Sequence, residues 1–462
     1  MKWPPTVRWM PDEARVHLLG IGGAGMSGLA ELLAAAGCQV SGCDQESSPA
    51  LDRLARCGIR VMVGHSPDHA AEAELLVVTS AVRADHPEVS AFVARRIPVV
   101  KRAAVLGWLT ADYETIAVAG THGKSTTSGM VTLVLEAAGF APGFAIGAAV
   151  RDLGGACARP SSGHLFVVEA DEYDYSFLQL APRVAVVLNV DHDHPDLYPS
   201  HASVVRSFRR FLERLPIDGV AVLSADDPVT RSFARDLEAA GRRVVTFGRS
   251  ADAHYAVRPD GTLRVPEGET WPLTLGVPGW HNRLNAAAAV AAAVQVGVPA
   301  AAAVRALRQF TGVGRRFEEV GTVRGVRIVL DYAHHPREVA ATIAAARERY
   351  AGARVWAVFQ PHTYSRTQAF LEQFAQALES ADVAVVTDVY AARESPLPGV
   401  DGEAVARRIR RIPVVAVPDP SAAATTVRAG MRAGDVVLFL GAGDIWKAAR
   451  LLRGDVCDAG TN

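Results

Sequence analysis

Short apolar runs alternate with helical patterns along most of this 462-residue chain. Continuous runs of Val, Leu and Ile between helices are typical of parallel strands that are buried on both faces. Parallel strands need right-handed crossover connections, so the pattern predicts doubly wound α/β sheets. The predicted strands occupy residues 16–20, 38–44, 74–80, 115–120, 165–170, 184–190, 220–224, 244–248, 327–333, 354–360, 383–389 and 435–441.

These strands are too many for one sheet, and the length suits several domains. One boundary is expected near KRAAVLGWLTADYET, where a helix leads into a fresh strand, and another near the connector QFTGVGRRFEEVG. The predicted domains are 1–108, 109–312 and 313–462. Turn residues between short alternating runs also predict a small antiparallel insert at 249–275.

The composition excludes some classes of protein but does not indicate a function. Hydrophobic residues make up 49% and charged residues 21%, as in ordinary globular proteins, and the formal net charge is −1. No general attraction to nucleic acid or to an anionic membrane is therefore expected. The longest apolar stretch, AAAAVAAAVQVGV, is short and rich in alanine, and it predicts a buried helix rather than a membrane span.

The first residues contain early prolines and mixed charges but no apolar core of a signal peptide, so a cytoplasmic protein is expected. The cysteines are few, odd in number and without CxxC spacing, which favours reduced thiols over disulfides or a zinc motif. They are Cys38, Cys43, Cys57, Cys157 and Cys457.

A glycine-rich segment, GIGGAGMSG, follows the first predicted strand. Gly20, Gly22 and Gly25 satisfy G-x-G-x-x-G at the start of an apolar helix, and Asp44 ends the next strand. Such a turn lets the backbone approach a pyrophosphate at a helix N-terminus. The spacing alone does not separate NAD from another pyrophosphate, or from a tight turn that binds nothing.

A second strand-to-helix turn, AGTHGKSTTSGM, has the ingredients of a phosphate loop. Gly123, Lys124 and Ser125 offer backbone donors, a lysine for the β- and γ-phosphates and a hydroxyl for Mg²⁺. The full Walker pattern is shortened, because its first glycine would fall at Val118. Two separate phosphate sites argue against a simple NAD-dependent dehydrogenase.

Acidic and histidine side chains follow the next two strands. Glu169 ends one strand, and the run NVDHDHPD follows the other. Carboxylates at adjacent strand ends can hold a divalent metal beside phosphates, although a solvated acidic loop is the alternative. The acidic and histidine residues are Asp171, Glu172, Asp174, Asp191, His192, Asp193, His194 and Asp196.

Polar groups also gather in PGWHNRLNAAAAV, DYAHHPRE and FQPHTYSRT. Asn282 could be only a helix N-cap, but Asn285 falls inside the first turns, where asparagine is a poor helix former. The other two segments follow strands, at the sheet edge where open α/β sheets bind ligands, although each could be a capping loop. Their candidate residues are Asp331, His334, His335, His362, Tyr364 and Arg366.

In order, GIGGAGMSGLA, GTHGKST, EADEYDYSFL, HN followed by NAAAA, GRRFE, DYAHHP, FQPHTYSRT and DVYAARESPLPG resemble the Mur ligases. The resemblance spans residue 16 to GAGDI at 441–445 and is greatest to the branch that joins L-alanine to UDP-N-acetylmuramate. It implies a three-domain α/β protein: an N-terminal Rossmann-like domain for the UDP substrate, a central P-loop-type ATPase domain, and a C-terminal Rossmann-like domain for the amino acid.

The resemblance also implies the reaction. ATP would phosphorylate the lactyl carboxylate, and the amine of L-alanine would attack the acyl phosphate, a step of peptidoglycan precursor synthesis. The cofactors would be ATP and Mg²⁺, with Mn²⁺ also possible because histidine is an unusual magnesium ligand. Closure of the C-terminal domain would exclude water. Monomer and homodimer both remain open.

Site roles come from the same resemblance. Metal ligands would be Ser125, Glu169 and His194. ATP contacts would be Gly120, Thr121, His122, Gly123, Lys124, Ser125, Thr126, His281, Asn282, Asn285, Arg316 and Asp331. UDP-substrate contacts would be Gly20, Gly22, Gly23, Gly25, Met26, Asp44, Ser80, Asp171 and Glu172. The catalytic set would be Lys124, Glu169, His194, Arg316, His334, His362 and Arg366, with His334 or His362 as the base.

Two positions depart from the family pattern, Thr363 in place of an arginine of some relatives and His86 in place of asparagine. Three competing interpretations remain. A ligase that reattaches a recycled tripeptide shares the EADEYD motif. An NAD-dependent oxidoreductase would explain the first glycine loop alone, and a non-catalytic nucleotide-binding regulator has no need of the metal set.

Overall fold

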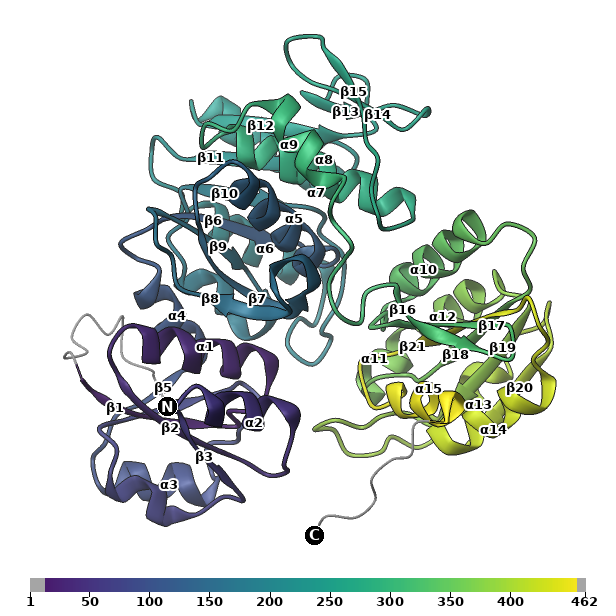
Figure 1. Cartoon of the computed structure of the whole chain (residues 1–462), viewed down its shortest axis with the longest axis horizontal. Helices are drawn as coiled ribbons and strands as arrows, with labels where there is room; N and C mark the ends of the chain where they lie inside the picture. Colours follow the sequence, from purple (N-terminus) through teal and green to yellow (C-terminus); the bar gives the residue numbers. More distant parts are fainter. Residues whose placement is uncertain (1–12, 455–462) are drawn as a thin grey trace. The chain divides into compact units, whose positions relative to one another are not determined.

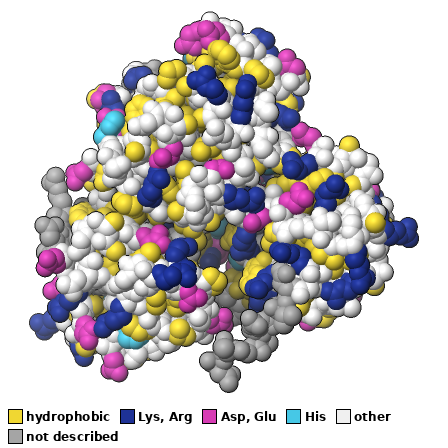
Figure 2. All heavy atoms as spheres, in the orientation of Figure 1, with side chains coloured by type: hydrophobic (Ala, Val, Ile, Leu, Met, Phe, Trp, Pro, Cys, Tyr) yellow, Lys and Arg dark blue, Asp and Glu magenta, His cyan; other side chains and the backbone are white. Residues whose placement is uncertain are grey.

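The computed structural model describes residues 13–454, which contain three β-sheets arranged in two compact units (Figure 1). The first unit comprises the chain up to Asp191, Ala202–Thr274 and Leu284–Phe310. The second comprises His192–His201, Leu275–Arg283 and the chain from Thr311. Figure 2 shows basic and acidic side chains interspersed on the visible face, in keeping with the net charge of −1.

The first sheet is parallel, with the order β3-β2-β1-β4-β5. One apolar cluster on it includes Leu18, Leu29 and Leu54, and another includes Leu19, Leu76 and Phe92. The chain order reverses between β1 and β4, and such switch points form the ligand crevices of open α/β sheets. The elements are β1 Arg15–Leu19, α1 Ala24–Ala35, β2 Gln39–Asp44, α2 Pro49–Arg56, β3 Arg60–Val63, η1 Pro67–Ala71, β4 Leu75–Val78, α3 Pro87–Ala94, β5 Val99–Lys101 and α4 Arg102–Leu109.

The second sheet has ten strands in the order β15-β14-β13-β12-β11-β10-β6-β9-β7-β8. Strands β9, β6, β10 and β11 are parallel neighbours at its centre. Strands β13 to β15 are mutually antiparallel, which confirms the predicted insert. The elements are β6 Glu114–Ala119, α5 Lys124–Ala137, β7 Gly143–Val150, η2 Arg151–Leu153, β8 Ala156–Arg159, β9 Leu165–Glu169, η3 Tyr173–Gln179, β10 Val184–Val187, α6 His201–Leu212, β11 Val220–Ser224, α7 Pro228–Ala239, β12 Arg243–Gly248, β13 Tyr255–Val257, β14 Thr262–Arg264, β15 Thr270–Pro272, α8 Trp280–Val294 and α9 Ala300–Leu307.

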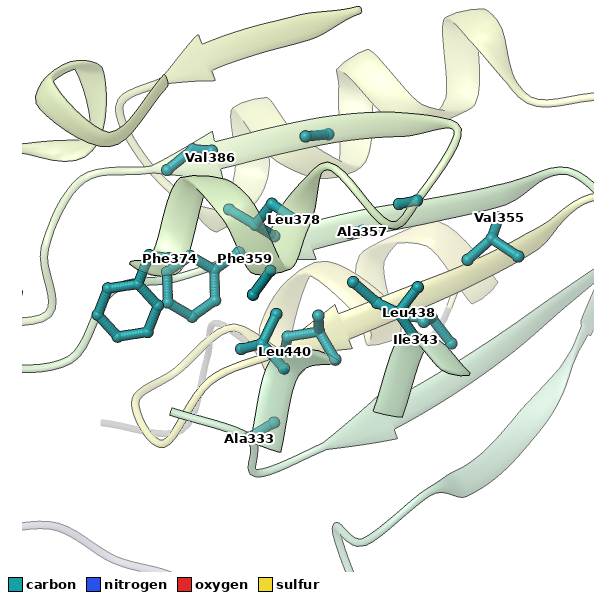
Figure 3. Close-up of a cluster of buried hydrophobic side chains, with 14 of the residues drawn as sticks. Ala333, Ile343, Val355, Ala357, Phe359, Phe374, Leu378, Val386, Leu438 and Leu440 are labelled. Carbon is teal, nitrogen blue, oxygen red and sulfur yellow. The ribbon is translucent and has the colours of Figure 1, made fainter. Parts of the chain in front are cut away.

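The third sheet has the order β16-β17-β21-β18-β19-β20 and is parallel except for the β16–β17 pair. Figure 3 shows its core, where Phe359 and Phe374 lie side by side with ring centroids 4.9 Å apart. The elements are β16 Glu318–Val323, β17 Val326–Asp331, α10 Pro336–Arg349, β18 Val355–Phe359, α11 Tyr364–Ala369, α12 Leu371–Leu378, β19 Val383–Thr387, α13 Gly402–Ala406, β20 Val414–Val417, α14 Pro420–Gly430, β21 Val436–Leu440 and α15 Trp446–Arg453.

Every strand predicted from an apolar run is present and has a parallel neighbour, with bounds shifted by a few residues. The strands without a prediction lie at or next to sheet edges, namely β3, β5, β7, β8, β16 and β20. Edge strands bury less of their surface, so their sequences carry a weaker apolar signal; β3 and β20 have no fully buried residue.

The four cysteines of the described residues are in no disulfide; Cys43 and Cys157 are buried and Cys57 is exposed. Residues 1–12 and Cys457, on which two sequence expectations rest, lie outside the described residues. Residues 286–294 of the alanine-rich stretch lie in α8, and residues 286–293 are buried, as predicted. Among the helices of residues 13–454, none combines the length and apolar character that crossing a bilayer requires.

Candidate active site

The first glycine loop joins β1 to α1 at the switch point of the first sheet. Gly20 adopts a φ of +80°, and the N–H groups of Gly20 and Ile21 donate to the carbonyl of Cys43 on β2. The N–H of Gly22 donates to Oδ2 of Asp44 at 2.8 Å. Asp44 therefore lies at the loop and stabilises its shape.

Arg102, which the sequence reasoning missed, lies against the same loop. A Cβ added to Gly25 would lie 3.2 Å from Nη1 of Arg102, so the guanidinium is at the first turn of α1. A cation at a helix N-terminus adds to the partial positive charge that favours a phosphate group there. No motif spacing predicts this contact, because Arg102 begins α4 and is distant from the loop in sequence.

Ser80, which follows β4, belongs to a polar group in the same unit. Its hydroxyl donates to Oδ2 of Asp174 at 2.7 Å, and Lys101 forms an ion pair with the same carboxylate. Asp174 has a left-handed φ of 55°, an uncommon conformation outside glycine. The structure thus joins the EADEYD segment to the ends of β4 and β5.

The second glycine loop joins β6 to α5. Gly123 is the helix N-cap, with a φ of +87°, and a Cβ added to it would meet Oδ1 of Asn285 at 2.7 Å. The amide of Asn189 accepts from the N–H of His122 and donates to its carbonyl, at 2.9 and 3.1 Å. The loop is therefore fixed from both sides, and Asn189 is a residue that the sequence reasoning did not single out.

Lys124 begins α5 and is largely buried. Its ammonium donates to the carbonyl of Gly120 at 2.7 Å and to Oε2 of Glu172 at 2.8 Å. Burial disfavours the charge, but the carboxylates of Glu172, Asp171 and Glu169 outweigh it and raise the pKa of Lys124 above its ordinary value. The lysine is therefore a permanent cation at the helix N-terminus.

Ser125 and Glu169 place oxygen atoms that can bind a metal ion next to this loop. Glu169 pairs with Val118 across β9 and β6, and its Oε2 accepts from the N–H of Gly147 at 2.7 Å. Ser125 lies in the first turn of α5 and is buried. A hydroxyl and a carboxylate beside a phosphate loop are the donors that Mg²⁺ prefers, so these two residues fit the metal that the sequence implies.

The HN…N segment is divided between the units. Helix α8 begins at Trp280, so Asn282 lies inside its first turn and the N-cap alternative is wrong; its amide donates to the carbonyl of Pro278 at 2.6 Å. His281 and Asn282 belong to the second unit, whereas Asn285 belongs to the first. Burial, followed by the charge of Arg316, lowers the pKa of His281 to about 4.

The second unit contains a buried ion pair at the His334–His362 region. Nε of Arg366 donates to Oδ1 of Asp193 at 2.8 Å, and Nη2 of Arg366 lies 3.4 Å from Nδ1 of His194. Burial alone would raise the pKa of Asp193, but the guanidinium of Arg366 outweighs it and holds this pKa well below its usual range. Arg366 thus positions the segment that carries His194.

The two histidines at strand ends have different tautomers. Nδ1 of His334 lies 2.9 Å from the carbonyl of Tyr332, which can only accept, so Nδ1 carries the proton and Nε2 is unprotonated. Nδ1 of His362 lies 3.2 Å from Nη1 of Arg366, which can only donate, so the proton of the neutral ring is on Nε2. The rings are 6.1 Å apart.

Both imidazoles are neutral near pH 7. Burial is the main cause for each; it lowers the pKa of His334 to about 4 and that of His362 to about 2. The charge of Arg366 contributes to both lowered pKa values, while that of Glu338 opposes the shift of His334. His334 is thus the stronger base, and its Nε2 is the nitrogen able to take a proton.

The GRRFE connector and the end of β17 form one polar group. Arg315 and Arg316 lie over the ring of Tyr332, at 4.7 and 5.2 Å from its centroid. Nη1 of Arg316 is 3.4 Å from Glu338, a residue absent from the sequence prediction although it follows His334 by one helical turn. Asp331 accepts from the N–H groups of Phe317 and Ala333, which fixes this strand end.

The two departures have structural roles of their own. His86 is the N-cap of α3, and its Nδ1 accepts from the N–H of Glu88, a role that asparagine also fills well. Thr363 is the N-cap of α11 with φ 64° and ψ 143°, a conformation that costs a β-branched residue about 1–3 kcal/mol. His335 is the capping residue of α10, so the capping alternative for DYAHHPRE holds for this histidine.

Three family models match successive parts of the chain. The Mur ligase family catalytic domain matches residues 15–114, the Mur ligase middle domain residues 118–293, and the Mur ligase glutamate ligase domain residues 315–443. These ranges contain both glycine loops and both histidine-bearing strand ends.

Whole proteins and structures agree with these models. The chain is 48% identical over 443 residues to UDP-N-acetylmuramate–L-alanine ligase of Kineococcus radiotolerans, covering 93% of this chain and 94% of that protein. It is 43% identical to the protein of that name from Renibacterium salmoninarum, covering 95% of each. The crystal structure of UDP-N-acetylmuramate-alanine ligase from Thermotoga maritima matches with a TM-score of 0.81 and 28% identity, over 96% of this chain and 98% of that one. With three consecutive family domains and full-length relatives of this identity, the chain belongs to the Mur ligase family.

Proposed function

We propose that this chain joins L-alanine to the lactyl carboxylate of UDP-N-acetylmuramate, with cleavage of ATP to ADP and phosphate, in peptidoglycan precursor synthesis. The names of its full-length relatives support this substrate pair. The observation that carries the chemistry is the buried Lys124, a cation fixed at the N-terminus of α5 beside oxygen donors. An NAD-dependent oxidoreductase would leave this loop without a role.

The first step activates a carboxylate, which is a poor acyl donor because its oxygens leave badly. Transfer of the γ-phosphoryl group of ATP to it forms an acyl phosphate, and ADP departs. Lys124 would contact the β- and γ-phosphates and stabilise the charge that develops during transfer. Ser125 and Glu169, with His194 from the second unit, would hold Mg²⁺, which when bound neutralises phosphate charge.

The second step needs an unprotonated amine. The amine of alanine attacks the acyl carbon, the tetrahedral intermediate collapses, phosphate leaves, and one proton must leave the nitrogen. We assign this proton to Nε2 of His334, because that nitrogen carries none and the ring is neutral. His362 presents an N–H at Nε2 and would instead donate to an oxygen of the reactants.

The remaining assignments follow from this reaction. UDP would lie at the Gly20–Gly25 loop with Asp44, Arg102 and Ser80 around it. The domains would be 1–108, 109–312 and 313–462, and the protein would act in the cytoplasm, where its nucleotide substrates are. Both units contribute to one reaction, so ligand-induced closure is expected to exclude water from the acyl phosphate.

Phosphate release from ATP in the presence of Mg²⁺ and UDP-N-acetylmuramate tests the proposal. The acceptors would be L-alanine, glycine, L-serine, L-alanyl-γ-D-glutamyl-meso-diaminopimelate, or none. Release that requires the sugar nucleotide and is fastest with L-alanine is expected. Release with the tripeptide alone would indicate a recycling ligase, and no release from a folded, ATP-binding protein would indicate a regulator.

The base is tested with hydroxylamine, a nucleophile that is already unprotonated at neutral pH. His334→Ala should lose alanine ligation yet still form the hydroxamate, because acyl phosphate formation does not need this base. The matched variant His362→Ala should slow both reactions. If His334→Ala loses hydroxamate formation as well, His334 acts in the first step and the assignment is wrong.

A further inference from the structure

A cluster of metal-binding side chains lies beneath the first glycine loop and has no role in the proposed ligation. His17 comes from β1, Cys43 from β2, His69 from η1 and Glu88 from α3. Their donor atoms all lie within 4.8 Å of one another, and three of the four residues are buried. Four elements of the first sheet and its helices thus converge on one point.

The distances between the side chains of the cluster are close to those between the ligands of a bound metal ion. Oε1 of Glu88 lies 3.0 Å from Nε2 of His17 and 2.9 Å from Nδ1 of His69, and its Oε2 lies 3.3 Å from Sγ of Cys43. Donors around a tetrahedral Zn²⁺ are separated by roughly 3.3–3.8 Å, given bonds of about 2.0–2.3 Å. The carboxylate of Glu88 would therefore have to move away from the two histidines by several tenths of an ångström to admit the ion.

One buried ring nitrogen of the cluster has a close but poorly aligned partner. Nε2 of His17 is buried and makes no aligned hydrogen bond, although it lies near Glu88. The other ring nitrogen of His17, Nδ1, is 2.9 Å from Oγ of Ser41, the second-partner arrangement that commonly orients a metal-bound histidine. A metal ion bound between this nitrogen and the Glu88 carboxylate would contact both groups directly.

The charges in the cluster favour a divalent cation. Glu88 is fully buried, and in the described part of the chain its ion-pair partners are all histidines: His17, His65 and His69. Burial opposes ionisation of Glu88, yet His17, His69 and Cys43 lower its pKa overall. Burial and the nearby carboxylate raise the pKa of the Cys43 thiol, so this sulfur becomes a thiolate only with a compensating cation.

We propose that His17, Cys43, His69 and Glu88 form a structural zinc site in the N-terminal part of this protein. One thiolate, two imidazoles and one carboxylate are a tetrahedral donor set that Zn²⁺ accepts, and the set contains no open position for catalysis. His65, whose Nδ1 is 3.2 Å from Sγ of Cys43, borders the site and is partly exposed.

The site has a direct connection to the glycine loop. The carbonyl of Cys43 accepts the N–H groups of Gly20 and Ile21, at 2.8 and 3.0 Å, and the next residue, Asp44, holds Gly22. A bond from Zn²⁺ to Sγ would fix residue 43 and, through these hydrogen bonds, the loop. Zinc is therefore expected to stabilise this part of the fold rather than to take part in phosphoryl transfer.

The test uses the full chain, stripped of metal with a chelator and titrated with Co²⁺ as a spectroscopic probe. One equivalent should produce a thiolate-to-cobalt charge-transfer band, and one equivalent of Zn²⁺ should remove it. Cys43→Ser should abolish the band, whereas Cys57→Ser, which changes an exposed cysteine of the same sheet region, should keep it. Absence of the band in the wild type, or its persistence in Cys43→Ser, would overturn the proposal.

A second variant separates loss of the site from misfolding. His69→Gln alters a partly exposed side chain on η1 and removes a direct ligand. It should keep the cobalt–thiolate band while lowering zinc affinity by at least the roughly 10–100-fold that loss of an outer-shell partner costs. Zinc should raise the melting temperature of the wild type and of Cys57→Ser, and not that of Cys43→Ser. If the cluster is instead a hydrogen-bond network that binds no metal, zinc should leave all of these melting temperatures unchanged. That result would exclude the site.

Discussion

The two glycine loops of the first unit are alike in position and unlike in charge. Each joins a buried parallel strand to a helix N-terminus, and each contains glycine with a positive φ. The Gly20 loop is held by the carboxylate of Asp44, and its nearby cation, Arg102, comes from another helix. The Gly123 loop contains its own cation, Lys124, which begins the helix.

This difference matches what each loop has to do. A loop that only holds a diphosphate needs backbone donors and one counter-charge, which any neighbouring element can supply. A loop at which a phosphoryl group is transferred needs a cation fixed relative to the reacting atoms. A lysine in the first residue of the helix gives that fixed position.

The largest effect is expected for Lys124→Ala. Loss of the fixed cation should lower kcat by about 10²–10³-fold, because its charge is needed most during transfer. Binding of UDP-N-acetylmuramate, measured by calorimetry, should be unchanged. Lys447→Ala, which removes an exposed lysine from α15, serves as the control. Equal loss of nucleotide-sugar binding would mean that the loops do not act separately.

The next effect comes from a matched pair of glycine substitutions. In Gly123→Ala the new Cβ meets Asn285 and the backbone is left-handed, whereas in Gly22→Ala it meets Leu51 and Asp44. Overpacking costs about 1–3 kcal/mol, which is roughly 5- to 150-fold in affinity. Steady-state kinetics should show a raised KM for ATP in the first variant and for the nucleotide sugar in the second.

Gly139→Ala controls for backbone strain in that pair, because Gly139 has a φ of +82° and no atom near its added Cβ. This variant should lose some stability and neither affinity. If Gly123→Ala and Gly22→Ala raise the same KM, the two loops serve one ligand.

A smaller effect is expected for Arg102→Ala. Removal of one charge-assisted contact to phosphate should raise the KM for the nucleotide sugar by about tenfold, leaving kcat unchanged. The difference from the wild type should shrink as salt concentration rises, because Arg102 is only partly buried and salt screens charges near the surface. Arg95→Ala, on the exposed end of α3, should have no effect.

The smallest effect is expected for Asp44. Asp44→Ala removes the acceptor of the Gly22 N–H and should lower the free energy of unfolding by about 1 kcal/mol, as measured in urea. Asp44→Asn keeps an acceptor oxygen and should retain most of the stability. If both variants equal the wild type, Asp44 does not stabilise the loop.

Local sequence was sufficient for the central strands, the two glycine loops and the positions of Glu169, His334 and His362. Each of these combines a buried apolar run with glycine or polar residues directly after it, so the signal lies within a few residues. Edge strands such as β3 and β20 lacked that signal because they are only partly buried.

Tertiary structure decided what depends on side chains distant in sequence. The pairing of Arg366 with Asp193, the approach of Arg102 to Gly25, and the tautomers of His334 and His362 all result from contacts between separate elements. The same holds for the cluster around Glu88, whose members come from four elements. A sequence specifies the order of strands and helices through local patterns, but the chemical state of a buried group depends on its neighbours in space.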